Sequence, residues 1–253
     1  MFTHAITRLP APSLVDGITT AGLGRPDFER ALDQHAAYVD ALRHCGLDVT
    51  VLPALPEFPD STFVEDSALL TGRCAIVTRP GADSRRGEAE LMRPELASRF
   101  AIVETIEAPG TLDAGDVMMV EDHFYIGLSE RTNDAGAEQL IAILLRHGYT
   151  GSTVAMREML HLKTGVNYLD RGRFLVTGEF VEARPFADFD RMEVPAAEAY
   201  AANSLWINGT VLVPAGFAQT RARIAALGYE VLDVDVSEFR KLDGGLSCLS
   251  LRY

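Results

Sequence analysis

The sequence predicts an α/β fold in which five similar modules close into a ring around a central axis. Four segments consist of an apolar strand, a polar turn and a second apolar strand, which is the pattern of a hairpin. The last segment, LDGGLSCLSLRY (242–253), begins a fifth copy but stops after one strand. Because THAITRLP (3–10) supplies the missing strand, the pattern favours a radial assembly of repeats closed by the first and last segments.

Helical periodicity marks four segments that lie between the hairpins: 26–46, 87–100, 133–149 and 217–229. Gly46, Gly148 and Gly228 stand where a helix commonly ends on a left-handed residue. A short β-rich run follows each helix: 47–53, 101–109, 150–156 and 229–236. This alternation of helices and strands also fits an open, doubly wound sheet, which is the alternative fold.

The four hairpin segments are 63–80, 112–129, 160–178 and 200–216, with TGR, EDH, DRGR and NG as their turns. Each expected module therefore contains a hairpin and a further strand, and most contain a helix on the outside. In a ring, equivalent strands point at one axis, so residues at equivalent positions should meet there.

Composition narrows the class of protein. The chain has 253 residues, a net charge of −13 and three cysteines, too few for a disulfide framework. An acidic chain is a poor nucleic-acid partner but suits a small cationic substrate. No apolar run reaches the ~20 residues of a membrane span, and no signal peptide is visible, so we expect a cytoplasmic protein without a membrane partner. No phosphate loop or metal-ligand spacing appears.

Charged and reactive residues stand where the hairpin segments begin: Glu65, Asp66, Asp113, Asp116, His161, Lys163, Asn203 and Cys248. Together they offer a nucleophile, a general acid or base, and anions for a cation. Each also has a structural reading: a cysteine as a small core residue, a histidine satisfied by hydrogen bonds, Asp116 as part of a turn. Their shared position on one axis favours the functional reading.

Six motifs then carry a resemblance: DSTFVEDSALL (60–70), RPGADSRRGE (79–88), APGTLDAGDVMM (108–119), YIGLSERTN (125–133), LHLKTG (160–165) and KLDGGLSCLS (241–250). In this order they resemble the dimethylarginine dimethylaminohydrolase family of the guanidine-modifying, or pentein, superfamily. The resemblance covers essentially the whole chain. It implies a fivefold pseudosymmetric α/β propeller, with ββαβ-like modules around a central active site, as one domain over residues 1–253.

The resemblance also implies a reaction: hydrolysis of Nω-methylated arginine to citrulline and methylamine or dimethylamine, through a covalent thiouronium intermediate. Carried over by motif, Cys248 is the nucleophile, His161 the proton shuttle and Asp113 the nearby carboxylate, where some family members carry glutamate. No cofactor or metal is implied. The cationic substrate, set against the sulfur, should itself promote thiolate formation.

The resemblance assigns the remaining contacts to the substrate: Glu65 and Asp66 for the guanidinium, Arg85 and Arg131 for the carboxylate, Asp60 for the α-amine, Leu242 for a backbone carbonyl contact, Ile18 in the lid SLVDGIT, and Phe63. Asp66 is the preferred guanidinium ligand, and Asp116 is expected to extend the acidic wall. The two arginines disfavour an agmatine-type substrate, which lacks a carboxylate.

Two alternatives stay open. An arginine deiminase-type hydrolase would use the same catalytic residues on unmethylated arginine, although those enzymes are longer. A non-catalytic guanidine-binding or amino-acid-binding protein would keep the pocket alone. The apolar helices and sheet edges also permit a homodimer.

Overall fold

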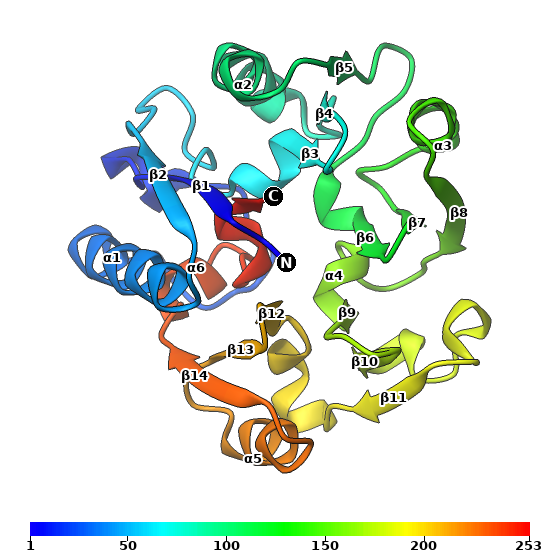
Figure 1. Cartoon of the computed structure of the whole chain (residues 1–253). Coiled ribbons are helices and arrows are strands. Elements are labelled where there is room, and N and C mark those ends of the chain that lie inside the picture. The colour runs from blue at the N-terminus through cyan, green and yellow to red at the C-terminus, as the bar shows by residue number, and fades with distance from the viewer.

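Five three-stranded sheets surround a central axis in the computed structural model, which describes residues 1–253 (Figure 1). The first sheet contains β15 (Leu251–Arg252), β1 (His4–Arg8) and β2 (Asp48–Leu52). The second contains β3 (Ala68–Leu70), β4 (Ala75–Val77) and β5 (Val103–Thr105). The third is β6 (Val117–Val120), β7 (His123–Leu128) and β8 (Thr150–Ala155). The fourth contains β9 (Val166–Tyr168), β10 (Arg173–Val176) and β11 (Asp190–Glu193). The fifth contains β12 (Leu205–Ile207), β13 (Thr210–Pro214) and β14 (Glu230–Val234).

Every sheet has the same internal order. The inner strand pairs antiparallel with the middle strand, and the middle strand pairs parallel with the outer one. A parallel pair needs a crossover connection, and four sheets use a helix on the rim for it: α1 (Phe28–His44), α2 (Arg86–Arg99), α3 (Asp134–Arg146) and α5 (Ala218–Ala226) (Figure 1). The β9–β11 sheet instead uses 3₁₀ turns at Gly178–Phe180 and Arg184–Phe186.

The turn chemistry read from the sequence matches the backbone. Asn208 and Gly209, between β12 and β13, have φ of 52° and 102°, as a two-residue turn with two left-handed positions requires. The three glycines expected after helices, Gly46, Gly148 and Gly228, also have positive φ.

Pairing of the first and last strands closes the ring. Ala5 lies opposite Arg252 and Ile6 opposite Leu251 in the antiparallel β1–β15 ladder. Since each sheet has three strands and none joins its neighbour by a ladder, the open doubly wound sheet is excluded and the fivefold propeller is confirmed.

The core is divided in the same way. Five buried apolar clusters fill the spaces between neighbouring sheets. The cluster between the first and last sheets, for example, joins Ala5 and Tyr38 to Leu212. None of the helices combines the length and apolar character that a membrane crossing requires. This packing fixes the sheets radially, so their inner ends meet at the axis.

Candidate active site

A helical turn precedes every inner strand and brings the candidate residues to the axis. These turns are Val64–Ser67, Ala114–Asp116, α4 (Leu162–Gly165), Ala196–Ala202 and Ser247–Leu249. The sequence predicts strand where several of these turns lie, and it places Cys248 in the one strand of the closing segment. The structure instead places Cys248 inside a turn, with only the two-residue β15 after it.

One cavity of about 60 Å³ collects nearly all of the predicted residues. Its walls contain Cys248, His161, Asp113, Ile18, Asp60, Phe63, Asp66, Arg85, Arg131 and Leu242. Glu65 is the exception: it lines a neighbouring cavity of about 40 Å³ that also reaches Cys248 and His161. Residues far apart in sequence thus face one small space, which is the juxtaposition that the ring predicts.

Cys248 is partly exposed, and its sulfur accepts a hydrogen bond from the Gly245 amide at 3.4 Å. Burial, followed by the nearby carboxylates Glu65 and Asp66, raises the pKa of this thiol to about 12. The thiol of Cys248 is therefore protonated at neutral pH among the protein's own groups. A cation bound against it would offset the carboxylates and favour the thiolate.

The carboxylates that disfavour the thiolate of Cys248 favour the charged form of His161. Its Nε2 lies 3.2 Å from Oδ2 of Asp113. Burial lowers the pKa of the imidazole, but Asp66, Asp113 and Asp116 outweigh burial and raise it to about 9. Burial likewise works to raise the pKa of Asp113, but the bond from His161 prevails and holds that pKa below its ordinary value. The pair is thus an imidazolium and a carboxylate at neutral pH.

Asp116 lies behind this pair and does not extend the acidic wall, contrary to the prediction. Its carboxylate accepts hydrogen bonds from Ser129 and Thr132 at 2.7 Å, and from the Leu162 amide at 2.9 Å. It is fully buried, and burial raises its pKa. Asp116 therefore ties the turn after His161 to the loop that carries Arg131.

The two arginines that are expected to bind the substrate carboxylate, Arg85 and Arg131, differ in their contacts within the protein. Arg85 is buried and donates from all three guanidinium nitrogens, to Glu88, to Asp66 at 2.6 Å and to the Phe63 carbonyl at 2.9 Å. The guanidinium of Arg131 lines the same cavity and has no hydrogen-bond or ion-pair partner in the protein. Arg131 is thus free to bind an anion, whereas Arg85 mainly holds Asp66 in place.

Glu65 is already engaged. Its Oε1 accepts from Lys163 at 2.7 Å and from Arg252 at 3.1 Å, and its Oε2 accepts from Ser247 at 2.8 Å. Asp66, by contrast, faces the cavity with His161, and its other contacts are Arg85 and the Gly115 amide. The geometry thus favours Asp66 as the guanidinium ligand.

The loop around Ile18 covers one side of the cavity. The Ile18 amide donates to Asp60 at 3.0 Å, and the Thr20 amide donates to Asp243 at 2.6 Å. Ile18 is 39% exposed, and its amide is the group that bonds to the cavity wall. Burial raises the pKa of Asp60, and a cationic amine beside it would reverse that shift.

Sequence reasoning missed several lining residues: Thr20, Leu160, Asp243 and Gly244. Asp243 has φ of 58° at the bend into the last turn. Its place before two glycines was the available signal, since Asp tolerates that conformation in turns. Ligand atoms of Asp66, Asp113 and His161 lie within 4.8 Å of one another, a spacing that a metal could use. The bonds from Arg85 and Gly81 already occupy carboxylate oxygens there, and we assign no metal.

Comparison with known proteins finds a matching family and several full-length relatives. Residues 53–200 match the family described as arginine deiminase. The chain is 57% identical to N(G),N(G)-dimethylarginine dimethylaminohydrolase of Pseudomonas aeruginosa, with 100% of both chains covered. It is 36% identical to the Streptomyces coelicolor protein of that name, over 98% of this chain and 96% of the other. A structure of the P. aeruginosa protein, a cysteine-to-serine mutant complexed with citrulline, matches with a TM-score of 0.99, 56% identity and full coverage of both chains.

Proposed function

The chain belongs to the dimethylarginine dimethylaminohydrolase family, and from that membership we propose that it hydrolyses Nω-methylated arginine with Cys248, His161 and Asp113 as catalytic residues. The products are citrulline and dimethylamine or methylamine. The main support for this proposal is that these three side chains, from three different modules, line one cavity. The same cavity is lined by Arg131, whose guanidinium has no ion-pair partner in the protein. We propose that residues 1–253 act as one catalytic domain.

The first half-reaction needs a thiolate near a guanidinium carbon. Burial and the carboxylates Glu65 and Asp66 raise the pKa of Cys248 to about 12, and positive charge on the substrate lowers it, so binding and activation are coupled. Attack of sulfur on the guanidinium carbon gives a tetrahedral intermediate. Asp66 and Asp113 face the substrate nitrogens and keep the guanidinium in place, because carboxylates match its donors.

The second role belongs to His161. An unprotonated amine is a poor leaving group, and the imidazolium of His161 can protonate the departing amine. The neutral imidazole that remains then accepts a proton from water, which attacks the thiouronium carbon and releases citrulline and the thiolate. Asp113, 3.2 Å from Nε2, stabilises the charged ring during this cycle.

The other end of the substrate meets a separate set of groups. Arg131 is proposed to bind the carboxylate, with Arg85 adding positive charge behind it. Asp60 and the backbone of Ile18 and Leu242 are proposed to bind the α-amine, while Phe63 packs against the substrate's methylene chain. This division separates amino-acid recognition from the chemistry at the guanidinium.

The test is citrulline formation from asymmetric dimethylarginine by the purified chain. We expect the wild-type chain to form citrulline and Cys248→Ser to form none, whereas Cys45→Ser, at a buried cysteine that lines neither cavity, should stay active. Retained activity in Cys248→Ser would disprove the assignment of the nucleophile. Binding of the substrate without any citrulline would indicate a non-catalytic binding protein.

The match to the arginine deiminase family favours a second candidate, hydrolysis of unmethylated arginine. The same catalytic residues could perform that reaction, so only the substrate separates the two. Parallel assays with arginine and asymmetric dimethylarginine decide between them. We expect a higher kcat/KM for the methylated substrate.

A further inference from the structure

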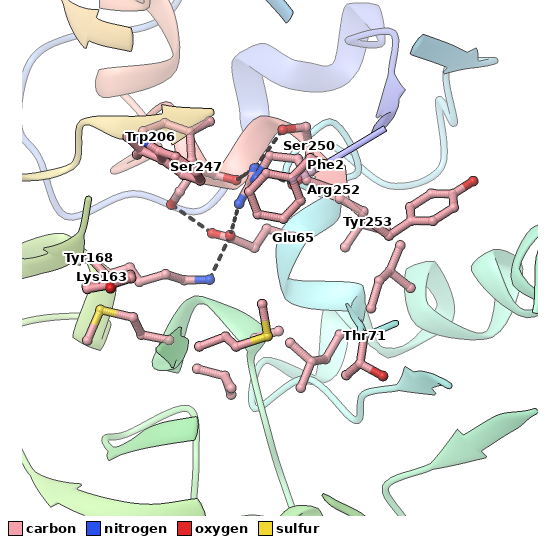
Figure 2. A pocket seen from close by; sticks show the side chains of 18 of the residues that line it. Phe2, Glu65, Thr71, Lys163, Tyr168, Trp206, Ser247, Ser250, Arg252 and Tyr253 are labelled. Atoms are coloured by element: carbon pink, nitrogen blue, oxygen red, sulfur yellow. Dashed lines mark hydrogen bonds and ion pairs between the residues drawn. The ribbon is translucent and has the colours of Figure 1, made fainter. Parts of the chain in front are cut away.

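A second, larger cavity lies on the axis, away from the proposed substrate site. Its volume is about 360 Å³, within the range of small-molecule sites, whereas the substrate cavity measures about 60 Å³. The inner strands of all five sheets contribute to its wall, through residues such as Leu69, Met118, Tyr168, Trp206 and Leu251. We call it the axial cavity (Figure 2).

One layer of side chains separates the axial cavity from the catalytic residues. Glu65, Lys163 and Ser247 line the axial cavity and also the small cavity that reaches Cys248 and His161. Figure 2 shows Lys163 and Arg252 converging on the Glu65 carboxylate. The side chain of Lys163 is only 12% exposed, so its charge stands in a poorly solvated place.

The hydrogen bonds of this layer are unevenly distributed. Arg252 donates to Glu65, to two carbonyl groups and to the Ser250 hydroxyl. Lys163 has three N–H donors, but its ammonium makes a single hydrogen bond, to Glu65. Two donors of this nearly buried cation therefore have no partner within the protein, on a residue that lines the cavity.

The rest of the wall is mostly apolar. Of its 25 residues, 16 are hydrophobic, including the aromatic side chains Phe2, Phe124, Tyr168 and Trp206. A cation would find Glu65 already paired with Lys163 and Arg252, and the other acidic lining residue, Glu121, is solvent-exposed. An anionic head group with an apolar body would satisfy the free donors of Lys163 and fill the apolar part.

We propose that the axial cavity binds a small monoanionic amphiphile, a carboxylate with an apolar chain, and that its head group takes Lys163 from Glu65 and thereby slows the chemistry at Cys248. The second part rests on the proposed function, since it takes Cys248 as the nucleophile. Lys163 favours the thiolate and Glu65 opposes it. Drawing the ammonium away leaves the Glu65 charge less neutralised beside the sulfur, so less thiolate forms.

The chain carries its own reporter for binding. Trp206 is the one tryptophan of the sequence and lines the axial cavity. With octanoate as the probe, we expect a saturable change in tryptophan emission. Octylammonium has the same chain length and the opposite charge, and octanol is neutral, so neither should give that change at the same concentration. Equal binding of octylammonium would overturn the choice of an anion.

Variants locate the head group. Lys163→Met should weaken octanoate binding by about tenfold or more, and Lys163→Arg should retain it. Lys241→Met is the matched control, because Lys241 pairs with Glu238 outside the cavity. Arg131→Ala tests whether octanoate sits in the substrate cavity: unchanged binding supports the axial cavity, and lost binding overturns it. If Lys163→Met does not fold, the comparison of octanoate, octylammonium and octanol with the wild-type protein still tests whether the axial cavity selects an anion.

Coupling is measured by alkylation of Cys248 with iodoacetamide at one fixed pH. Saturating octanoate should slow it several-fold, and an unchanged rate would overturn the coupling. The emission change should persist in Cys248→Ser. A failure of the proposed function would appear as citrulline formation by Cys248→Ser, whereas a failure of this proposal would appear in the Trp206 signal or in the alkylation rate.

Discussion

At the scale of single residues, Arg131 has the most informative contacts, because a cavity-lining guanidinium without a partner in the protein calls for an anion from outside. Arg85 lies in the same wall but is bound by Asp66, Glu88 and backbone carbonyls. Removal of Arg85 would thus disturb Asp66 as well as the substrate. Removal of Arg131 breaks no side-chain contact within the protein, so we expect it to change substrate recognition alone.

Arg131→Ala is therefore expected to raise KM for dimethylarginine by roughly 10- to 100-fold with a smaller change in kcat, the cost of one charge-assisted contact. Arg86→Ala is the control, since Arg86 pairs with the exposed Asp83 at the surface. Steady-state citrulline assays provide both constants. An equal loss in the two variants would show that general charge, and not this contact, binds the carboxylate.

The His161–Asp113 pair predicts the alkaline side of the pH profile. The pKa of His161 is raised to about 9, so the imidazolium that protonates the amine persists up to that pH and activity should fall above it. Asp113→Asn removes one source of the rise. We expect the alkaline limb of kcat/KM to move to lower pH and kcat to fall by about 10²-fold or more. Asp113→Glu should restore much of the activity, and an unmoved limb would argue against the pairing.

The His161–Asp113 pair also makes the free energy of unfolding depend on pH, in a direction that the two pKa shifts determine. His161 has a higher pKa in the folded chain than its ordinary 6.5, so its contribution is complete below about pH 6.5 and is lost as pH rises through about 9. Asp113 has a lowered pKa, so its contribution is present above the ordinary 3.8 and is lost as pH falls. Urea unfolding should show wild type losing stability between pH 6.5 and 9 relative to His161→Gln. Parallel curves would contradict this.

Residue types were predictable from the sequence, but their partners were not. Glu65, Asp66, Asp113 and Asp116 are all carboxylates at the entrances of modules. Asp66 and Asp113 face the substrate cavity, whereas Glu65 faces Lys163 and Arg252, and Asp116 faces hydroxyl and amide donors. The partners of Glu65 come from other modules, and Asp116 is bonded both by Thr132 of its own module and by the Leu162 amide of the next. Spacing along the chain does not reveal such contacts.

At the scale of elements, the hairpins and long helices follow from local signals, and the turns at the axis do not. A helix such as Phe28–His44 repeats its apolar face several times, and Asn208–Gly209 is a strong turn signal. The turn Ser247–Leu249 is three residues long. That length is shorter than one helical period, so alternation alone suggested a strand there.

The glycines before Cys248 give that last turn its position. A Cβ on Gly244 would lie 2.2 Å from Cε1 of Phe63, and one on Gly245 would lie 2.5 Å from Oδ1 of Asn203. The main chain therefore passes against the residues that precede β3 and β12, in the second and fifth modules, on its way to the cysteine. Asn203 also bonds the Ser247 amide at 3.0 Å, which fixes the turn from the other side.

Gly244→Ala should displace the turn, lowering kcat at least about tenfold and costing about 1–3 kcal/mol of unfolding free energy, as overpacking does. Gly72→Ala is the matched control, because the nearest atom to its Cβ would be the Tyr149 hydroxyl at 3.7 Å. Phe63→Leu in the Gly244→Ala background should recover stability. Wild-type kcat in Gly244→Ala would show that the close approach has no role in placing Cys248.

At the scale of the molecule, the ring is closed by hydrogen bonds between segments at opposite ends of the chain. The sequence predicts this closure because the last hairpin segment has only one strand and residues 3–10 can supply the other. Five separate apolar clusters then pack each sheet on two neighbours. Loss of one sheet would expose two of these clusters at once, so the ring should unfold as a unit.

Closure can be tested by cutting the ring and by relinking it. The amides of Thr3 and His4 each lie 2.9 Å from the Tyr253 carbonyl, so a short Gly-Ser linker can join the termini without strain. A permutant joined there and opened at the exposed turn of Gly216 should fold and form citrulline at close to the wild-type rate. Deletion of 251–253 removes the buried Leu251 and the Arg252–Glu65 pair, and should cost at least about 3 kcal/mol and abolish activity. Urea midpoints and citrulline assays measure both chains. An active truncated chain with the wild-type urea midpoint would show that β15 is not needed to close the ring. In that case the packing of β1 and its neighbours would hold the catalytic turn in place without β15.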